Sequence, residues 1–248
     1  MRRLALAILI LVILIQPGRF AATGISVVAE GSTQTMRNVT LYCQTDPSEA
    51  GGGKVLKTTL PGLTQYSADA SRDISFNLRQ PLGGSLRIAG TVVFRLWLSA
   101  YAATRVMLNA TLFEVTSQGL RKEVCALQVG VDLEDRIREF IMAIGDVKYT
   151  FAQYSMIQFC IVAKPSTSVN VGLYWGGSKT PTQVVLPCVD HVSVDVSTYY
   201  MNGTASSSFP VAEAGNAAVR IQANVINPFG SDDLKAFDIT VTDSRDLR

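Results

Sequence analysis

The stretch that decides the fold is Leu86–Leu98, which reads LRIAGTVVFRLWL. Along its second half two sets of side chains alternate, with Val92, Phe94, Leu96 and Leu98 on one face and Val93, Arg95 and Trp97 on the other. A period of two is typical of a β-strand that packs one face against a core. We therefore expect a long strand here, and we expect Trp97 to pack in the core because the whole stretch is so apolar.

Short runs rich in branched and aromatic residues surround this strand, with polar or Gly/Pro stretches between them. They are Ile25–Ala29, Arg37–Cys43, Asp73–Leu78, Val106–Val115, Glu123–Val129, Tyr149–Phe151, Met156–Val162 and Val169–Trp175. Strands at this spacing, with turn residues between them, are typical of a β-sandwich. The sequence thus predicts an all-β protein.

One segment, Asp132–Ile144, fits two patterns. Five apolar side chains lie at helical spacing, and Asp132 is a suitable helix cap; the five are Leu133, Ile137, Phe140, Ile141 and Ile144. Equally, Glu139–Ile144 has the composition of a strand buried on one face. We favour a short helical turn or loop followed by a strand.

The composition changes near Pro187-Cys188. Beyond it, His191–Tyr199 alternates, and further strand-like runs follow at Ala217–Val225 and Ala236–Val241. These runs resemble the opening of an immunoglobulin-like sandwich, which needs ~7 strands and ~100 residues. Only about 60 residues follow Cys188, so we expect residues 188–248 to form a partial Ig-like domain that is either truncated or completed by strands from elsewhere.

The first 24 residues predict a secretory signal peptide. Arg2 and Arg3 precede the apolar run Leu4–Ile15, a Pro/Gly break follows, and Ala22-Thr23-Gly24 offers a small-x-small cleavage site. Cleavage there would make Ile25 the first residue of a secreted or cell-surface protein. The apolar run is shorter than the ~20 residues that a membrane-spanning helix needs, and we expect no such helix in the mature chain.

Removal of this signal changes the charge balance. The full chain has 22 basic and 20 acidic residues, for a net charge of +2. Residues 1–24 contain three of the basic residues and none of the acidic ones, so the mature chain has a net charge of about −1. A nucleic-acid partner would require a basic stripe, which the mature sequence does not show.

The four cysteines, Cys43, Cys125, Cys160 and Cys188, include no C-x-x-C pair. In an exported protein an even number predicts up to two disulfides, with three pairings open. Four buried thiols are the alternative. A zinc site would require closely spaced ligands and more histidine than the single His191.

Three N-x-[ST] sequons, at Asn38, Asn109 and Asn202, become candidate glycan acceptors once export is assumed. Asn38 and Asn109 lie in strand-like segments. Their side chains must therefore face solvent if they are modified.

Several phrases resemble known β-sandwich domains. Phe76 to Leu98, continuing through Asn109–Val115, is similar to the jelly-roll domain of secreted peptidases and esterases of the cocaine-esterase type. Gly176–Pro187 resembles the last strand of similar domains in archaeal and bacterial surface proteins, and Asn227-Pro228-Phe229-Gly230 matches a phrase of the Ig-like repeat that follows there. The resemblance implies a jelly-roll domain over residues 25–187. It implies no catalytic residue, because the nucleophile of those hydrolases lies in a separate domain.

Few side chains stand out as candidate ligand-binding groups. Tyr174 and Trp175, beside Gly176-Gly177, are the best candidates for an exposed aromatic platform for sugars. We interpret His191 as an exposed linker residue. The acidic residues Asp132, Glu134, Asp135, Asp232 and Asp233 leave a structural calcium ion as an alternative to plain solvated loops, but they lack the spacing of a calcium loop. We expect no other cofactor.

The favoured function is a non-catalytic secreted or surface protein that acts in adhesion, envelope structure or assembly. An incomplete last sandwich leaves a strand edge open, and strand exchange between copies is one way to complete it. A carbohydrate-binding module is the first alternative. A secreted hydrolase with an unrecognised acidic site is the second, although no G-x-S-x-G motif is present.

Overall fold

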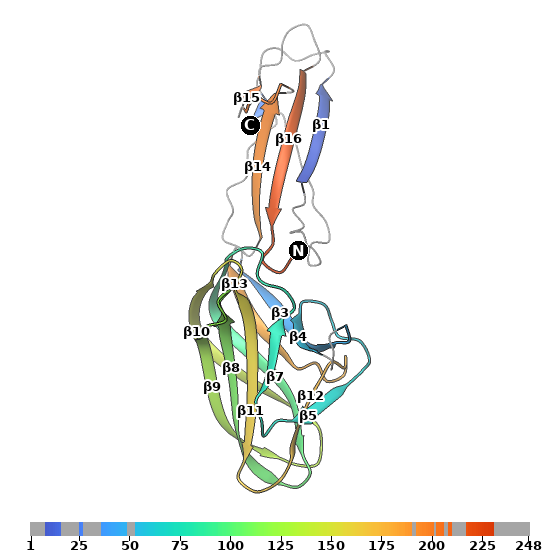
Figure 1. Cartoon of the computed structure of the whole chain (residues 1–248), viewed down its shortest axis with the longest axis vertical. Coiled ribbons are helices and arrows are strands. Elements are labelled where there is room, and N and C mark those ends of the chain that lie inside the picture. The colour runs from blue at the N-terminus through green and yellow to red at the C-terminus, as the bar shows by residue number, and fades with distance from the viewer. Residues whose placement is uncertain are drawn as a thin grey trace, which may run out of the picture. The chain divides into compact units, whose positions relative to one another are not determined.

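The computed structural model describes residues 8–15, 25–26, 36–48, 53–189, 192–200, 202–205, 208–209 and 217–230. Every regular element among them is a β-strand, which confirms the all-β prediction (Figure 1). The chain divides into two compact units, one of residues Gln34–His191 and one that joins Met1–Thr33 to Val192–Arg248. Among the described residues, no helix has the length and apolar character to span a membrane.

The Gln34–His191 unit contains 11 hydrogen-bonded strands. One part of the strand order runs β10–β7–β13–β3–β4, with β12 and β5 beside the end of β7; the other runs β6–β11–β8–β9. A short parallel pairing of β4 with β6 joins the two parts. The bounds are β3 (Met36–Asp46), β4 (Gly53–Lys57), β5 (Tyr66–Asp69), β6 (Ile74–Leu78), β7 (Leu86–Ala100), β8 (Thr104–Val115), β9 (Arg121–Leu133), β10 (Arg138–Phe151), β11 (Met156–Pro165), β12 (Val171–Trp175) and β13 (Gln183–Val189).

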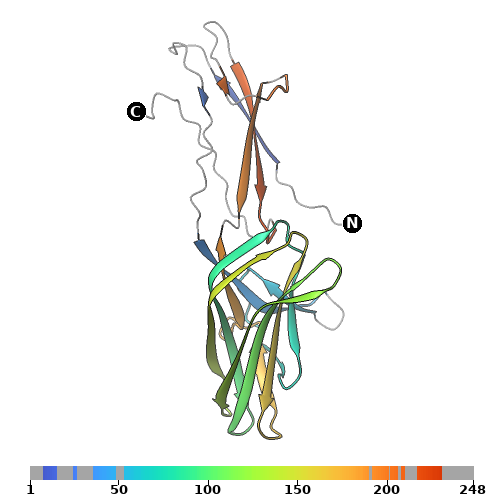
Figure 2. The same cartoon turned by 90° about the vertical axis from the view of Figure 1, so that its left-hand side faces the viewer.

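The two parts pack face to face as a sandwich (Figure 2). The rings of Phe94 on β7 and Phe159 on β11 stack at 5.0 Å between centroids, although these strands are not hydrogen-bonded neighbours. The predicted inner face of β7 is fully buried, together with facing side chains of the other sheet: Val92, Phe94, Leu96, Leu98, Phe76, Leu112 and Ile161. Burial of these large apolar groups is the main force that holds the sheets together.

Strand β7 is the centre of its sheet because both of its edges are paired. β10 covers one edge over nearly the full length, and β13 and then β12 cover the other. The pairing shifts register near Gly90, in β10 between Ile144 and Val147 and in β13 between Val185 and Cys188. Gly90 has φ +134°, and a Cβ there would lie 3.2 Å from the Pro187 side chain, so only glycine fits this bulge.

The ambiguous segment contains no helical turn. β9 ends at Leu133, residues 134–137 form the connection, and β10 begins at Arg138. The loop-and-strand interpretation is therefore correct. The apparent helical spacing arises because Phe140 and Ile144 point toward the core while Ile141 lies on the outer face, 58% exposed.

The other unit contains a three-stranded sheet in the order β1–β16–β14 and a two-stranded pairing of β15 with β2. The bounds are β1 (Ile8–Ile15), β2 (Ile25–Ser26), β14 (Ser193–Tyr200), β15 (Ser208–Phe209) and β16 (Ala217–Ile226). β1 is the core of the predicted signal, and in the full chain it pairs with β16 over Ala217–Asn224. The predicted domain break at Pro187-Cys188 falls within β13 of the first unit.

The phrase Asn227-Pro228-Phe229-Gly230 forms a tight turn directly after β16. The Asn227 side-chain oxygen accepts a hydrogen bond from the Phe229 amide at 3.0 Å, and the Asn227 carbonyl accepts one from Gly230 at 3.1 Å. Asparagine is common in such turns because its side chain can bond its own backbone two residues on. Gly230 has φ 93°, which favours glycine.

Candidate functional site

Two edge strands that are consecutive in the chain, β9 and β10, leave one side of the sandwich open. Within the described residues β9 pairs only with β8, and β10 pairs only with β7. Each strand therefore presents a row of backbone N–H and C=O groups that no other described strand uses. Such edges are the usual places where a second chain adds a strand. We call the region between these two edges the open side.

The core is only partly covered along the open side. On β9, Leu127 and Val129 stand opposite buried side chains of β8 and face inward, yet they are half-buried. On β10, Phe140 and Ile144 stand opposite the buried Leu96 and Val92 and are also half-buried. Side chains that point into a sandwich are normally covered by the facing sheet, so apolar surface here remains accessible to a partner.

Both edges lack charge along their middle. Residues 124–131 of β9 read VCALQVGV, and residues 140–145 of β10 read FIMAIG. Natural sheets commonly protect an exposed edge with lysine or another charge, or with a bulge. Both strands carry a bulge: β10 at Ile144/Val147, with Asp146 at φ 55°, and β9 at Val124, which has no partner on β8. Beyond its bulge β9 stays regular and uncharged over Cys125–Val131.

A buried carboxylate fixes one end of the open side. Glu114 on β8 accepts a hydrogen bond from the Tyr149 hydroxyl of β10 at 2.6 Å and another from the Ala152 amide at 2.7 Å. Burial alone would raise the pKa of Glu114, but the hydrogen bonds outweigh it and the pKa is lowered. Burial and the Glu114 charge raise the pKa of Tyr149. Lys122 of β9 lies over the Tyr149 ring, 4.9 Å from its centroid.

The connection between β9 and β10 closes the other end. The Ala100 amide, at the end of β7, donates to the Glu134 carbonyl at 2.7 Å. Two of the three acidic side chains here have basic partners, since Glu134 pairs with Arg138 at 2.8 Å and Asp132 with Arg105 at 3.6 Å. No group of metal-ligating side chains occurs among the described residues. The calcium alternative is thus not supported at this cluster, while Asp232 and Asp233 lie outside the described residues.

The aromatic platform is not where the sequence placed it. Trp175 is only 4% exposed, its ring nitrogen donates to Thr45 Oγ1 at 3.0 Å, and its ring packs against Phe76 and Tyr66. The expectation of an exposed Trp175 is therefore wrong: the side chain belongs to the inner face of β12. Tyr174 is half-buried on the outer face, where its hydroxyl lies 3.0 Å from Ser99 Oγ.

The expectation for Trp97, which placed this side chain in the core, is also wrong. It stands directly opposite Tyr174 and between the fully buried Leu96 and Leu98, so it lies on the outer face of the sheet and not in the core. Its side chain is half-buried. The alternation of β7 already separated Trp97 from the inward-facing residues, and that signal is more reliable than the apolar character of the stretch.

The cysteines form no disulfides, which corrects the prediction of up to two; all four are buried, as in the alternative. The strand register shows why one pairing fails. Cys125 stands opposite the buried Leu112 and faces inward, whereas Cys160 stands opposite Thr111 and lies on the other face of the same sheet. Burial raises the pKa of Cys125 to about 12 and that of Cys43 well above its ordinary value.

The three sequon asparagines, Asn38, Asn109 and Asn202, are all exposed. The two that lie in strands therefore meet the condition that their side chains face solvent. His191 lies outside the described residues. Whether any of these residues is modified or functional remains a prediction.

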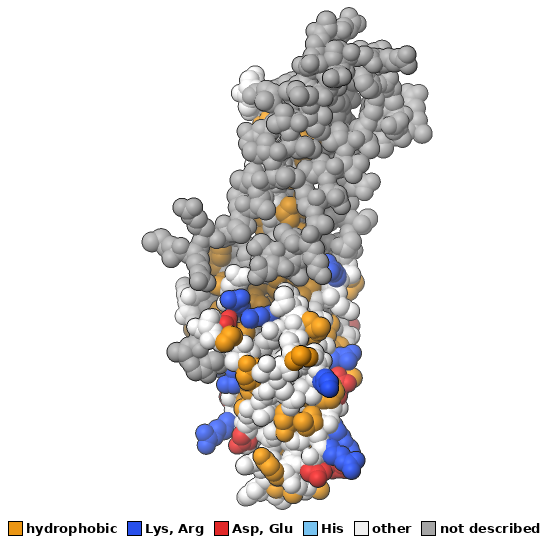
Figure 3. All heavy atoms as spheres, turned by 90° about the vertical axis from the view of Figure 1, so that its right-hand side faces the viewer, with side chains coloured by type: hydrophobic (Ala, Val, Ile, Leu, Met, Phe, Trp, Pro, Cys, Tyr) orange, Lys and Arg blue, Asp and Glu red, His pale blue; other side chains and the backbone are white. Residues whose placement is uncertain are grey.

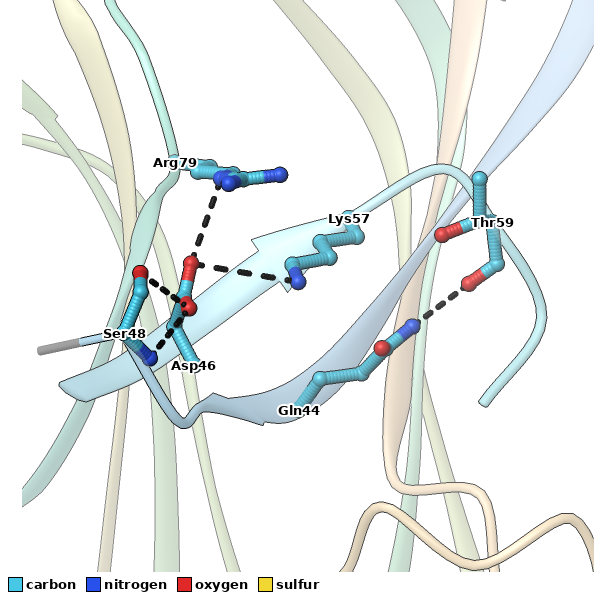
Figure 4. A network of polar contacts seen from close by, with 6 residues as sticks. All are labelled: Gln44, Asp46, Ser48, Lys57, Thr59 and Arg79. Atoms are coloured by element: carbon cyan, nitrogen blue, oxygen red, sulfur yellow. Dashed lines mark hydrogen bonds and ion pairs between the residues drawn. The ribbon is translucent and has the colours of Figure 1, made fainter. Parts of the chain in front are cut away.

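A second buried carboxylate holds the strands near the β3–β4 connection (Figure 4). Asp46 accepts hydrogen bonds from the Ser48 hydroxyl at 2.6 Å and amide at 3.0 Å, and it lies 3.2 Å from Arg79 Nε and 3.9 Å from Lys57 Nζ. The Ser48 hydrogen bonds, followed by the two basic groups, lower the pKa of Asp46. Gln44 donates to the Thr59 carbonyl nearby. The network ties β3 and β4 to the end of β6 and supports their short parallel link.

The side of the molecule that lies to the right in Figure 1 has a mixed surface. Figure 3 shows hydrophobic side chains scattered among uncharged ones in its described part, with charged side chains of both signs mostly near the outline. Scattered apolar residues of this kind are ordinary on a protein surface. This face therefore gives no signal as specific as the uncharged edges of the open side.

No protein-family model matches the sequence, and no curated protein matches it. Solved structures do match. A CocE/NonD family hydrolase from Staphylococcus aureus aligns with a TM-score of 0.52 and 13% identity, over 62% of this chain and 36% of the hydrolase. This likeness confirms the predicted resemblance to the β-sandwich portion of such hydrolases, and at this identity it shows the fold alone.

Two further matches are weaker. An aminopeptidase from a marine sediment archaeon, Thaumarchaeota archaeon, aligns with a TM-score of 0.46 and 15% identity, over 60% of this chain and 37% of that one. The structure of infectious bursal disease virus Gt strain aligns with a TM-score of 0.29 and 16% identity, over 90% of this chain and 51% of that one. The chain thus spans little more than a third of the hydrolase and aminopeptidase and about half of the viral protein. The predicted resemblance to archaeal and bacterial surface proteins stays a prediction.

Proposed function

We propose that this is an exported, non-catalytic β-sandwich protein of adhesion, envelope structure or assembly, and that it assembles through its open side. The main support for this proposal is the edge of β9 over Val124–Val131, which has no charged residue and pairs with no described strand on its outer side. A strand added there would bond the idle backbone groups and cover the half-buried Leu127 and Val129. The added hydrogen bonds and the burial of these two side chains would exist only in the assembled state.

The partner that best fits β9 is a second copy of β9. Two such strands running antiparallel about a twofold axis would bring their uncharged stretches together. The same arrangement would place the basic Arg121 and Lys122 near the acidic Asp132 of the other copy, with the acidic Glu123 as a like-charged neighbour of that Asp132. Opposite charges on neighbouring strands contribute modestly, while like charges would oppose the pairing.

Sedimentation equilibrium of the full chain tests this proposal. Ala126 is exposed on the outer face of β9, so Ala126→Lys should spare the fold while it puts an extra positive charge in the middle of the pairing. We expect at least about a tenfold weaker dimer, since the variant both adds like charge and blocks close approach. Thr91→Lys is the matched control, because Thr91 is exposed on β7, whose two edges are already paired. Equal effects of both variants, or a monomer at all concentrations, would refute the proposal.

A carbohydrate-binding function is the second candidate, now resting on different residues. Trp97 and Tyr174 are register partners on the outer face, each half-buried. Aromatic faces of this kind can stack on sugar rings. Binding to a glycan array that is lost in Trp97→Ala but kept in Trp175→Phe would favour this candidate; an array without any binder would remove it.

A further inference from the structure

The outer face of the β9–β8–β11 sheet carries a shallow hollow of about 190 Å³ that Asn109 helps to line. In the strand register Asn109 stands between Gln128 of β9 and Val162 of β11, and Met107 and Lys164 form the next row. Asp73, which precedes β6, completes the lining. Directly opposite side chains on neighbouring strands lie about 4.5–5.5 Å apart at Cβ, so a group attached to Asn109 starts within reach of this set.

The hollow combines an apolar floor with a polar rim. Met107, 43% exposed, and the half-buried Val162 offer apolar contact, while Asp73, Gln128 and Lys164 are exposed. In the described part of the chain no side-chain hydrogen bond or ion pair engages these three polar groups. Together they provide both donors and acceptors at the edge of an apolar patch, which is the chemistry that a sugar ring and its hydroxyl groups require.

The sequon at this place has both of its functional side chains on the same outer face. Asn109 and Thr111 are two residues apart in β8, and Thr111 Oγ1 donates to Asn109 Oδ1 at 3.4 Å. The amide nitrogen of Asn109, the atom that carries an N-linked glycan, has no described partner. The hydrogen bond thus holds the amide while the nitrogen remains available over the hollow.

We propose that Asn109 is glycosylated and that the first sugar of its own glycan occupies this hollow. The hollow is smaller and more open than the ~300–1,000 Å³ clefts that bind free ligands, and a free sugar would also lose its translational and rotational freedom on binding. A sugar that is covalently attached to Asn109 avoids most of that loss because it is already present at high effective concentration. This inference rests on the proposed export of the chain.

The test expresses the full chain through a eukaryotic secretory pathway and maps glycans at Asn38, Asn109 and Asn202 by mass spectrometry. An endoglycosidase then removes glycans from the native and the unfolded protein. If the first sugar lies in the hollow, the endoglycosidase should release the glycan of native Asn109 about tenfold more slowly than that of Asn202. A factor of about ten is what two or three hydrogen bonds of modest net strength would contribute. Gln128→Ala combined with Lys164→Ala should abolish this protection, while both changes leave the sequon intact; Ser166→Ala, in an exposed loop, is the control.

Each outcome decides a different point. If the protein is exported but Asn109 carries no glycan, the inference is wrong and the proposed function is unaffected. A glycan on Asn109 that is released as fast as the one on Asn202, or whose protection survives the double variant, overturns the seating in the hollow. A chain that never enters the secretory pathway overturns both the inference and the proposed export.

Discussion

Removal of the Glu114–Tyr149 hydrogen bond should destabilise the sandwich at the end of its open side. This bond joins β8 of one sheet to β10 of the other at 2.6 Å, and the carboxylate is buried. Hydrogen bonds to charged groups contribute about 1.5–3 kcal/mol, so Tyr149→Phe should lower the free energy of unfolding by about that amount. Glu114→Gln should lower it by about 1–2 kcal/mol, because the amide can still accept from Ala152 and donate to the Tyr149 hydroxyl, but both hydrogen bonds lose the charge that strengthens them.

Urea unfolding followed by tryptophan fluorescence measures these changes in the relevant unit, since the two tryptophans of the chain, Trp97 and Trp175, both lie in it. The double variant should be less destabilised than the sum of the single variants, with a coupling of about 1–2 kcal/mol. Glu123→Gln, at an exposed carboxylate of β9, is the matched control.

The pH dependence has a definite sign. The folded-state pKa of Glu114 is lowered, so its stabilisation is complete above the unfolded-state value and is lost as the pH falls through the folded-state value. The difference in the free energy of unfolding between wild type and Glu114→Gln should therefore be largest at pH 7. It should shrink as the pH falls below about 4.5. A Glu114→Gln variant within about 0.5 kcal/mol of Glu123→Gln at pH 7 would refute this reasoning.

Three further results are expected. All four thiols should be countable after denaturation without a reductant, and Cys125 should react slowly with iodoacetamide in the native protein at pH 8, because burial raises its pKa to about 12; mass shifts that reveal a disulfide would contradict this. Trp175→Phe should cost more stability than Trp97→Phe, as the melting temperature would report, because Trp175 loses both core packing and its bond to Thr45. Asp46→Asn should destabilise the protein at pH 7. The stability difference from wild type should narrow below about pH 4, because the folded-state pKa of Asp46 is lowered; a stability difference that does not change with pH would argue against the charge network.

The strands could be predicted because their signal is local. The alternation along Leu86–Leu98 marks the inner face of β7 correctly at Val92, Phe94, Leu96 and Leu98. The errors concern facts that depend on partners far away in the chain. The Gly176-Gly177 pair suggested an exposed strand end at Trp175, but Phe76 and Tyr66, about 100 residues earlier, cover the ring. The prediction of disulfides was wrong for a similar reason, because the strand pairings of β8 put Cys125 and Cys160 on opposite faces of the sheet.

The open side could not be predicted either. The uncharged run at Val124–Val131 is visible in the sequence, but whether a strand is central or at an edge depends on the strand order. The sequence instead placed an open edge in the last unit. There the apolar run of the predicted signal appears as β1 beside β16, so export and cleavage would remove a strand that the full chain pairs.

Hydrogen–deuterium exchange at two protein concentrations tests the assembly through β9 most directly. Backbone amides of Val124–Val131 should exchange more slowly at high concentration, where a second copy pairs with the edge, and those of β7 should be unchanged because β7 is already paired on both sides. The Ala126→Lys variant should show the low-concentration pattern at both concentrations. Unchanged exchange in Val124–Val131, with protection appearing elsewhere as the protein assembles, would contradict the proposed role of the open side.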